Sequence, residues 1–342
     1  METKLKGELF HKGILRKEDD CFIIRQSIPY PLQENNAYLI ESSNGWSVID
    51  VGIDLPLTRE VWEMALKEVG ISFRQIRQIY ITHCHPDHLG AARWLQQKCD
   101  APVFMHREEI KRAREFIFIE EDFPAVYRRA IEAECNRHGF ESRFLDGLIL
   151  DWQTQVTPLF RAPRGIYPLD AGDEIDLAGE KYQIILAPGH ADGQVMLFEP
   201  GSRRLFCADV LTENSYLHFS DWPNTFLENP LGDLFDSLDL MESLEVAKVY
   251  PGHGFCFTNL QEIMDTLREK HWRNLGKVLA AITEPVRSGD LYPQLFSKIY
   301  PIDYVHLHRL LLGETLGYME YLFRRGRLQK TDDGDRVVFG GR

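Results

Sequence analysis

The sequence lacks any long hydrophobic run. No stretch approaches the roughly 18 uninterrupted apolar residues that a membrane-spanning helix needs. Residues 1–14 contain Lys and Glu but no apolar segment of the kind that a signal peptide has. The six cysteines are scattered, and no two of them form a CxxC pair. Such cysteines in a large chain indicate reduced thiols, so we expect a cytoplasmic protein with no membrane partner.

Positive charge is also scarce. The chain has 39 Lys and Arg against 52 Asp and Glu, which gives a net charge of −13. From residue 257 onward, 13 Lys and Arg accompany 11 Asp and Glu, a balance of +2, so residues 1–256 carry −15. Because an acidic surface repels a phosphate backbone, this charge weighs against nucleic acid as a partner but leaves an RNA-cleaving alternative open.

The sequence does contain a regular alternation of short apolar runs and amphipathic segments. With 342 residues, 44% of them hydrophobic, the chain is long enough for about two globular domains. Strand–helix alternation predicts an α/β fold. Strands are expected at 37–40, 46–51, 78–82, 102–105, 182–187, 195–198, 204–207 and 248–250, and helices at 58–70, 89–98 and 234–244. Residues 108–152 are predicted to be a mostly helical, aromatic-rich insert that covers the functional site.

The last quarter of the chain has a different pattern. Helices are predicted at 264–282, 291–299 and 304–325, followed by a hairpin formed by 328–331 and 337–339. Three helices and a hairpin indicate a winged-helix-like module. We therefore predict a catalytic domain at 1–257 and a C-terminal domain at 258–342. The last helix is too apolar to lie in a DNA groove, and the apolar tail helices are compatible with a homodimer.

One short motif carries most of the chemical information. His83-Cys84-His85-Pro86-Asp87-His88 follows the strand expected at 78–82 and precedes a helix. Two imidazoles that are two residues apart on an extended segment point the same way, so Cys84 between them points into the core. Histidine and carboxylate ligands together suit zinc, iron or manganese.

Three further candidate ligands each follow a predicted strand. His190 comes after the strand at 182–187, Asp209 ends the run at 204–207, and His253 follows the strand at 248–250. Ligands in open α/β folds collect at the carboxyl ends of strands. We therefore expect these three side chains to join the histidine motif in one metal site.

In order and spacing, these residues resemble the ligands of the metallo-β-lactamase superfamily. The matching positions are His83, His85, Asp87, His88, His190, Asp209 and His253, and Asp50 matches the Asp of that family's early strand-end motif. The resemblance covers about residues 20–256. The tail is similar to LACTB-like members that carry a winged-helix domain, and other members are glyoxalase II-like. The resemblance implies an αββα sandwich of two mixed sheets covered by helices.

The resemblance also implies roles for these residues. His83, His85 and His190 would hold one divalent metal ion, while Asp87, His88 and His253 would hold another, with Asp209 bridging them. Zinc is the expected metal, with iron and manganese as alternatives. A hydroxide that bridges the two ions would be the nucleophile, oriented by Asp87. Asp50 would fix the ligand loop or an imidazole N–H.

Protonation of the leaving group needs another donor. Tyr216 and His218 lie in the loop after Asp209 and are the candidates that the sequence offers. Zinc β-lactamases of the best-known class have a Cys where this chain has Asp209, so lactam hydrolysis is not the expected main activity.

Four functions therefore stay open at this point. The leading hypothesis is a dinuclear hydrolase of a small ester or thioester, in the manner of glyoxalase II. The LACTB-like tail suggests an endoribonuclease as the alternative. A persulfide dioxygenase would use His83, His190 and Asp209 on one iron. A DNA-binding regulator with the metal site as a sensor is the non-catalytic possibility, and the apolar last helix argues against it.

Overall fold

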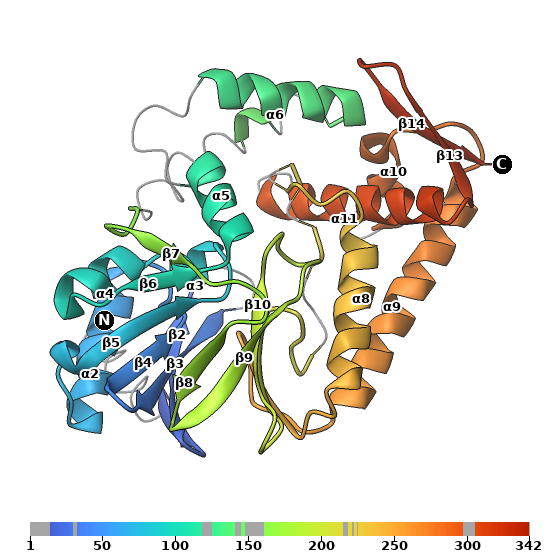
Figure 1. Cartoon of the computed structure of the whole chain (residues 1–342). Coiled ribbons are helices and arrows are strands. Elements are labelled where there is room, and N and C mark those ends of the chain that lie inside the picture. The colour runs from blue at the N-terminus through green and yellow to red at the C-terminus, as the bar shows by residue number, and fades with distance from the viewer. Residues whose placement is uncertain are drawn as a thin grey trace, which may run out of the picture.

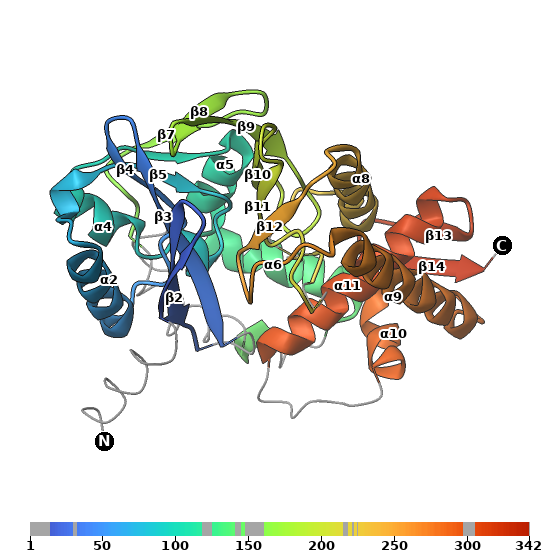
Figure 2. The same cartoon turned by 90° about the horizontal axis from the view of Figure 1, so that it is seen from below.

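Two mixed β-sheets lie face to face, and helices cover both outer faces (Figure 1). The structure is a computed structural model that describes residues 14–29, 33–117, 125–140, 145–147, 161–214, 218–220, 222, 223, 225–296 and 305–341. Figure 2 shows the layers from below, with α2 and α4 on one side of the sheets and α8 and α9 on the other. This is the arrangement of helical layers around two mixed sheets that the sequence predicted.

The first sheet has seven strands in the order β1-β2-β3-β4-β5-β6-β7. The strands β1 to β4 are antiparallel to one another, and β4 to β7 are parallel. Their bounds are Leu15–Glu18, Cys21–Ser27, Glu34–Ser42, Gly45–Ile49, Ile76–Ile81, Val103–Met105 and Ile166–Pro168. The hairpin predicted around residues 42–45 is confirmed as β3–β4, whereas β1, β2 and β7 were not predicted.

The second sheet has five strands in the order β12-β11-β10-β9-β8. Strands β11 and β12 are parallel, and the other neighbours are antiparallel. The bounds of β8 to β12 are Glu174–Leu177, Glu180–Leu186, Val195–Glu199, Arg204–Ala208 and Lys248–Pro251. Four of these five strands were predicted from their apolar runs. The fifth, β8, is short and half acidic.

Alternation along the strands divides the interior into layers. Successive side chains of a strand point to opposite faces of its sheet. In β3, Tyr38 joins the cluster between the two sheets, while Leu39 packs toward the helices that cover the first sheet. In β10, Leu197 faces the other sheet and Phe198 faces the second helical layer. Strands β10 and β11 are buried on both faces, which explains why their sequences are continuous apolar runs.

Helices close both sides of the sandwich. The first sheet is covered by helices α2 (Pro56–Val69) and α4 (Ala92–Cys99), with the single turn η1 (Phe73–Gln75) between them. Helix α2 begins at Pro56 and not at Thr58, because proline at the first helical position needs no N–H partner. It ends at Gly70, as predicted, where a φ of 83° places the residue in the left-handed region.

The helical character predicted for residues 108–152 is confirmed where the structure describes it. Helices α5 (Arg107–Phe116) and α6 (Ala125–His138) lie in this segment. Residues 118–124, 141–144 and 148–160 are outside the described residues, and so are the aromatic side chains Phe118, Phe123, Phe144 and Trp152. Whether the insert covers the functional site therefore stays a prediction.

The C-terminal elements share a core with the second sheet. After α8 (Pro230–Ser243) come α9 (Leu260–Ala281), α10 (Ser288–Leu295) and α11 (Val305–Arg324), and then the hairpin β13 (Leu328–Asp332) and β14 (Val337–Gly341). One continuous cluster joins Met196 of β10 to Tyr318 and Phe339. The three helices and the hairpin are the predicted elements, and α11 is buried as expected. The winged-helix assignment and the domain boundary at 257 stay predictions.

Within the residues that the structure describes, no helix combines the length and the apolar character that crossing a membrane requires. All six cysteines are unpaired, as their spacing indicated. Cys84 is fully buried and packs in the core between the first sheet and its helices, which confirms its predicted orientation.

A buried histidine in the C-terminal core provides a prediction of pH-dependent stability. His271 of α9 is fully buried, with its Nδ1 2.9 Å from the Tyr318 hydroxyl. Burial, followed by the charge of Lys270, lowers the pKa of His271 to about 3. Between about pH 6.5 and pH 3 the unfolded chain binds a proton that the folded protein does not bind. The free energy of unfolding should therefore fall as the pH falls through this range.

We expect His271→Gln to reduce this pH dependence, because glutamine keeps a polar partner for Tyr318 but does not titrate. From pH 7 to pH 4.5 the natural protein should lose about 2–3 kcal/mol more stability than the variant. Urea unfolding curves of both proteins at the two pH values measure this difference. An equal loss in both would contradict a neutral, buried His271.

Candidate metal centre

The histidine motif lies where a buried strand meets a short helix. Strand β5 ends at Ile81, and His83 and His85 follow it in extended backbone. Helix α3 (Pro86–Leu89) then carries Asp87 and His88. His83 and His88 are fully buried, while Asp87 keeps slight exposure. The predicted strand-to-helix setting of the motif is confirmed.

The other three candidate ligands come from the second sheet. His190 follows β9, Asp209 follows β11, and His253 follows β12. The backbone at Gly252 lies very close to the Asp209 side chain, since a Cβ atom on Gly252 would be only 2.1 Å from Asp209 Oδ1. Only glycine fits at this position. Ala208, directly before Asp209, has a φ of 46°. The site is therefore formed at the carboxyl ends of strands from both sheets.

Three imidazoles form the first part of the cluster. His83 Nε2 and His190 Nε2 each lie 3.0 Å from His85 Nδ1. Their ligand atoms all lie within 4.8 Å of one another. This group is the one that the resemblance assigned to the first metal ion.

Asp87, His88 and His253 form the second part. His253 Nε2 is 3.4 Å from Asp87 Oδ2, and the three ligand atoms again lie within 4.8 Å of one another. Asp209 lies between the two parts. Its Oδ2 is 3.1 Å from His253 Nε2 and 3.4 Å from His190 Nε2, and its Oδ1 is 3.4 Å from His88 Nε2. The structure thus brings all seven predicted ligands together.

Hydrogen bonds on the outer side of the rings fix how the histidines point. The Nδ1 of His190 donates to the backbone carbonyl of His218 at 2.8 Å, and the Nδ1 of His253 donates to the carbonyl of Glu34 at 2.6 Å. A carbonyl accepts only, so both Nδ1 atoms carry a proton, and in the neutral ring the Nε2 atom keeps the lone pair. These lone pairs face the centre of the cluster, as in a metal-ligating histidine.

Asp50 orients a third ring. Its Oδ2 accepts from His88 Nδ1 and from the Thr82 hydroxyl, both at 2.8 Å, and its Oδ1 accepts from the Thr82 backbone N–H at 2.8 Å. Thr82 in turn lies 3.0 Å from His83 Nδ1. Asp50 therefore connects the end of β5 with two ligand rings. This geometry fits a positioning residue, although its predicted role in the reaction is not tested.

The donor set fits bound cations. His85 Nδ1 lies 3.0 Å from both His83 Nε2 and His190 Nε2, and all three nitrogens lie within 4.8 Å of one another. Lone pairs on such close nitrogens repel one another unless a cation lies between them. Within the described residues, His88 Nε2 and Asp209 Oδ1 are buried and make no hydrogen bond. Imidazole and carboxylate ligands suit divalent metals, but zinc, iron and manganese all accept this set.

The protonation states agree with this arrangement. Burial, followed by neighbouring charges, lowers the pKa of both His83 and His85 well below the usual histidine value. Burial alone would raise the pKa of Asp209, but His253 and His88 hold it well below its ordinary value. Burial would likewise lower the pKa of His88 and His253, but the charge of Asp209 raises both above the usual histidine value. His83 and His85 are therefore neutral and Asp209 is ionised, which are the forms that bind metal ions, while His88 and His253 are paired with carboxylates.

The structure describes only one of the two predicted proton donors. The ring of His218 lies beside the cluster, with its centroid 4.7 Å from that of His190 and 5.9 Å from that of His85. Tyr216 is outside the described residues. The structure thus places His218 at the site, and the catalytic role of either residue stays a prediction.

The sequence analysis missed a buried carboxylate that connects the ligand loops. Glu109 of α5 is fully buried. Its Oε2 accepts from the Cys84 backbone N–H and its Oε1 accepts from the Gly193 N–H, both at 2.7 Å. Arg112 lies 3.9 Å from Glu109 Oε2 and donates to Cys84 Sγ at 3.3 Å. Charged residues on a helix usually indicate a solvent-exposed face, so no local signal identified this pair.

Two asparagines at the start of β3 were also missed. Asn35 Nδ2 donates to the Asp87 carbonyl at 2.5 Å, and Asn36 Nδ2 donates to the Pro251 carbonyl at 3.0 Å. Both residues are buried. Strand β3 begins at Glu34 and not at Ala37, because residues 34–36 pair with the end of β2 while the two buried amides find backbone partners distant in sequence.

Comparison with known proteins supports the fold and the type of site. Residues 31–253 match the family model for the metallo-beta-lactamase superfamily. The probable metallo-hydrolase YqjP of Bacillus subtilis (strain 168) is 22% identical over 332 residues, which cover 94% of this chain and 98% of that protein. A hydroxyacylglutathione hydrolase of Vibrio cholerae serotype O1 is 31% identical over 99 residues, 29% of this chain and 36% of that protein.

A solved structure resembles nearly the whole chain. The crystal structure of a metallo-beta-lactamase family protein from Thermus thermophilus is similar with a TM-score of 0.79 and 26% identity. The match covers 95% of this chain and 99% of that chain. The C-terminal helices and hairpin are therefore part of a shared architecture.

Proposed function

The chain belongs to the metallo-β-lactamase superfamily and is a metal-dependent hydrolase, and we propose that it hydrolyses a small ester or thioester with two divalent metal ions, zinc in preference to iron or manganese. One observation carries this proposal. Two groups of ligands, one of His83, His85 and His190 and another of Asp87, His88 and His253, lie on either side of Asp209. A shared carboxylate between two such groups suits a pair of ions.

The chain's own residues have distinct tasks in this proposal. When bound, two divalent ions lower the pKa of water and polarise the carbonyl oxygen of the substrate. Asp87 keeps 11% of its side chain exposed whereas Asp209 keeps 3%, which favours Asp87 as the residue that would accept the proton of the attacking water. His218, whose ring lies beside that of His190, would donate a proton to the leaving group. Asp50 holds the His88 ring in its inward orientation.

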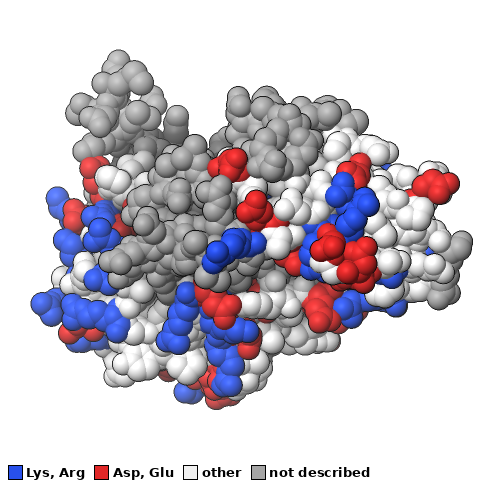
Figure 3. Space-filling model, turned by 90° about the horizontal axis from the view of Figure 1, so that it is seen from above, with Lys and Arg blue, Asp and Glu red and all other residues white. Residues whose placement is uncertain are grey.

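Two observations support a small substrate. The 31% identity to a hydroxyacylglutathione hydrolase over 99 residues favours a thioester. On the face shown in Figure 3, the described Lys and Arg residues are interspersed with Asp and Glu. A continuous basic stripe, which a long RNA would need, is not seen among the described residues of that face.

The metal content of protein purified without added metal or chelator tests the number of ions. We expect about two ions per chain, and we expect Asp87→Ala to reduce this number toward one, because it removes one ligand of the second group. Asp265→Ala is a matched control, since this exposed aspartate of α9 lies outside all candidate ligand groups. The same preparations are then assayed with acyl-glutathione and acyl-coenzyme A thioesters, aryl esters and single-stranded RNA.

Each result decides between the alternatives. Thioester or ester hydrolysis that is lost in Asp87→Ala supports the proposal. A single iron in both proteins, with oxygen uptake on glutathione persulfide, would overturn it in favour of the dioxygenase. Cleavage of RNA at low salt, with no ester or thioester hydrolysis, would favour the endoribonuclease.

A further inference from the structure

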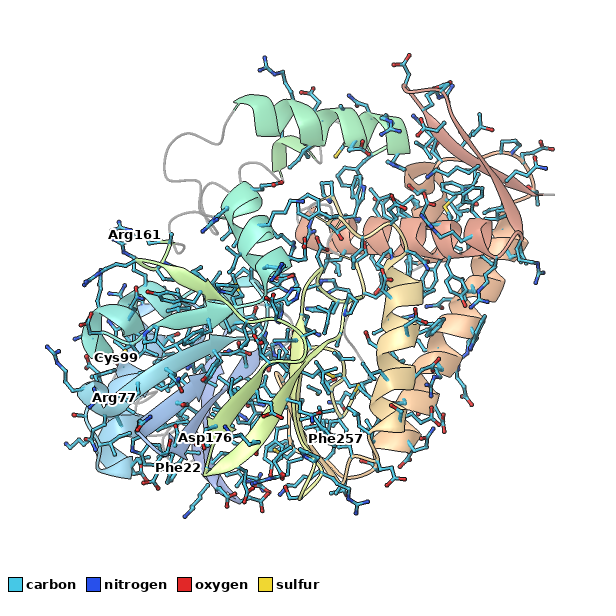
Figure 4. All side chains as sticks on the ribbon, in the orientation of Figure 1. Phe22, Arg77, Cys99, Arg161, Asp176 and Phe257 are labelled. Carbon is cyan, nitrogen blue, oxygen red and sulfur yellow. The ribbon has the colours of Figure 1, made fainter. Side chains whose placement is uncertain are left out.

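A second recess lies away from the metal centre, at the open edge between the two sheets. The groove has a volume of about 360 Å³, and none of the seven candidate metal ligands lines it. One wall comes from β5 and β6 of the first sheet, and the opposite wall comes from β8, the edge strand of the second sheet. Figure 4 labels Arg77 and Asp176, which belong to the two walls and lie at the lower left of the molecule.

The wall on the first sheet is aromatic. Tyr80, Phe104 and Tyr167 are register partners on the adjacent strands β5, β6 and β7. The Tyr80 and Phe104 rings are stacked with their centroids 5.4 Å apart, and Tyr167 follows at 5.7 Å. Tyr167 is 57% exposed although its strand is part of the main sheet. Tyr80 is covered by the second sheet, so Phe104, which lines the groove, and the exposed Tyr167 beside it are the accessible part of this aromatic row.

The hydroxyl of Tyr80 gives this wall a polar group. Tyr80 is 3% exposed and lines the groove. Its ring stacks on Phe104, and its hydroxyl makes no hydrogen bond to any residue that the structure describes. Because Tyr80 lines the groove, a ligand there can supply the hydrogen-bond partner of this hydroxyl. Burial, and then the charge of Asp176, raise the pKa of Tyr80 to about 12, so the hydroxyl stays protonated.

The opposite wall is acidic. Asp173, Glu174 and Asp176 line it, against the single cation Arg77, so the lining has an excess of two negative charges. Asp176 Oδ1 accepts a weak hydrogen bond from the Ser43 N–H at 3.4 Å, and Asp173 Oδ2 accepts from the Asp170 N–H at 2.8 Å. Each of these two carboxylates therefore has a second oxygen that can meet a ligand. Acidic groups opposite an aromatic face favour a cation.

We propose that this groove binds a small organic ammonium ion that carries a planar apolar group. The planar group lies against Phe104. The ammonium group donates to the carboxylates of β8, and the Tyr80 hydroxyl accepts a further hydrogen bond from it.

The test compares two ligands of matched shape, 2-phenylethylammonium and the neutral 2-phenylethanol, on the full-length protein as purified. Binding is followed by ligand-observed NMR titration. We expect the ammonium ion to bind about tenfold more tightly than the alcohol, because only the ion forms charge-assisted hydrogen bonds. Asp176→Asn should remove most of this preference, and Tyr80→Phe should weaken binding of the ion. Asp100→Asn, on the exposed end of α4, is the control and should change neither value.

Two results would overturn the proposal. One is equal binding of the ion and the alcohol to the natural protein. The other is unchanged binding of the ion in both Asp176→Asn and Tyr80→Phe, which would place the ion elsewhere, for example on the metal centre. Thermal melting provides a second readout for Tyr80. Without ligand, Tyr80→Phe should melt no lower than the natural protein, and a clear decrease would mean that the hydroxyl already has a partner.

Discussion

Replacing Asp209 by asparagine should abolish hydrolysis and empty the metal centre. Asp209 lies within 3.4 Å of ring nitrogens of His88, His190 and His253, so it serves both ligand groups. Asparagine has the same shape, but it replaces an anionic oxygen with an amide that cannot neutralise two cations. We expect at least about a 10³-fold loss of kcat, since metal ions supply several kcal/mol of transition-state stabilisation. Metal content per chain should fall from about two toward zero.

Asp100→Asn is the matched control for this experiment. Asp100 caps α4 in the left-handed region with a φ of 61°, a conformation that asparagine also adopts readily. The control should keep its metal and its activity. Asp209→Asn protein that retains two ions and more than a tenth of its activity would contradict a bridging role for Asp209.

Replacing Glu109 by alanine should destabilise the whole protein and weaken metal binding. The change removes the acceptor of two buried N–H groups, those of Cys84 and Gly193, and takes one negative charge away from the buried Arg112. Breaking a buried ion pair in this way costs about 3–5 kcal/mol. In a chain of this size that corresponds to a decrease of roughly 5 °C in melting temperature.

Glu109→Ala should also weaken metal binding, because the two N–H groups that lose their acceptor belong to loops that carry candidate ligands. Cys84 lies between two ligands, and Gly193 is three residues after His190. Loss of a group that orients ligands typically reduces metal affinity by about 10–100-fold, which competition with a chromogenic chelator measures. Glu108→Ala is the control, because the neighbouring Glu108 is exposed. Equal melting temperatures and metal affinities for the two variants would show that Glu109 does not hold the loops.

Much of the fold was predictable because the inner strands are apolar on both faces. The runs that became β5, β9, β10, β11 and β12 stand out from the turns around them. The strands β1, β7 and β8 did not, because they are three or four residues long and carry polar or exposed side chains. Such segments become strands only because a neighbouring strand offers hydrogen-bond partners.

In the candidate site, too, contacts between residues that are close in sequence were predictable, and contacts between distant residues were not. Four candidate ligands lie within the six consecutive residues 83–88, namely His83, His85, Asp87 and His88. Their proximity in space therefore follows from their proximity in sequence. The partners of Asn35 and Glu109 could not be inferred in this way. The amide of Asn35 meets the carbonyl of Asp87, which is 52 residues away, and Glu109 accepts from Gly193, which is 84 residues away.

The sequence by itself determined the α/β class, the strand-end positions of the ligands and the histidine motif at 83–88. These properties depend on periodicity and on residue types at short spacing, which are local. The full set of seven candidate metal ligands followed from the resemblance of the sequence to a known family. Only the tertiary structure decided which groups orient the ligands, how the C-terminal helices join the core of the second sheet, and where a second groove opens. These properties depend on contacts between segments far apart in the chain, and a buried charge or hydroxyl is recognised only when its surroundings are known.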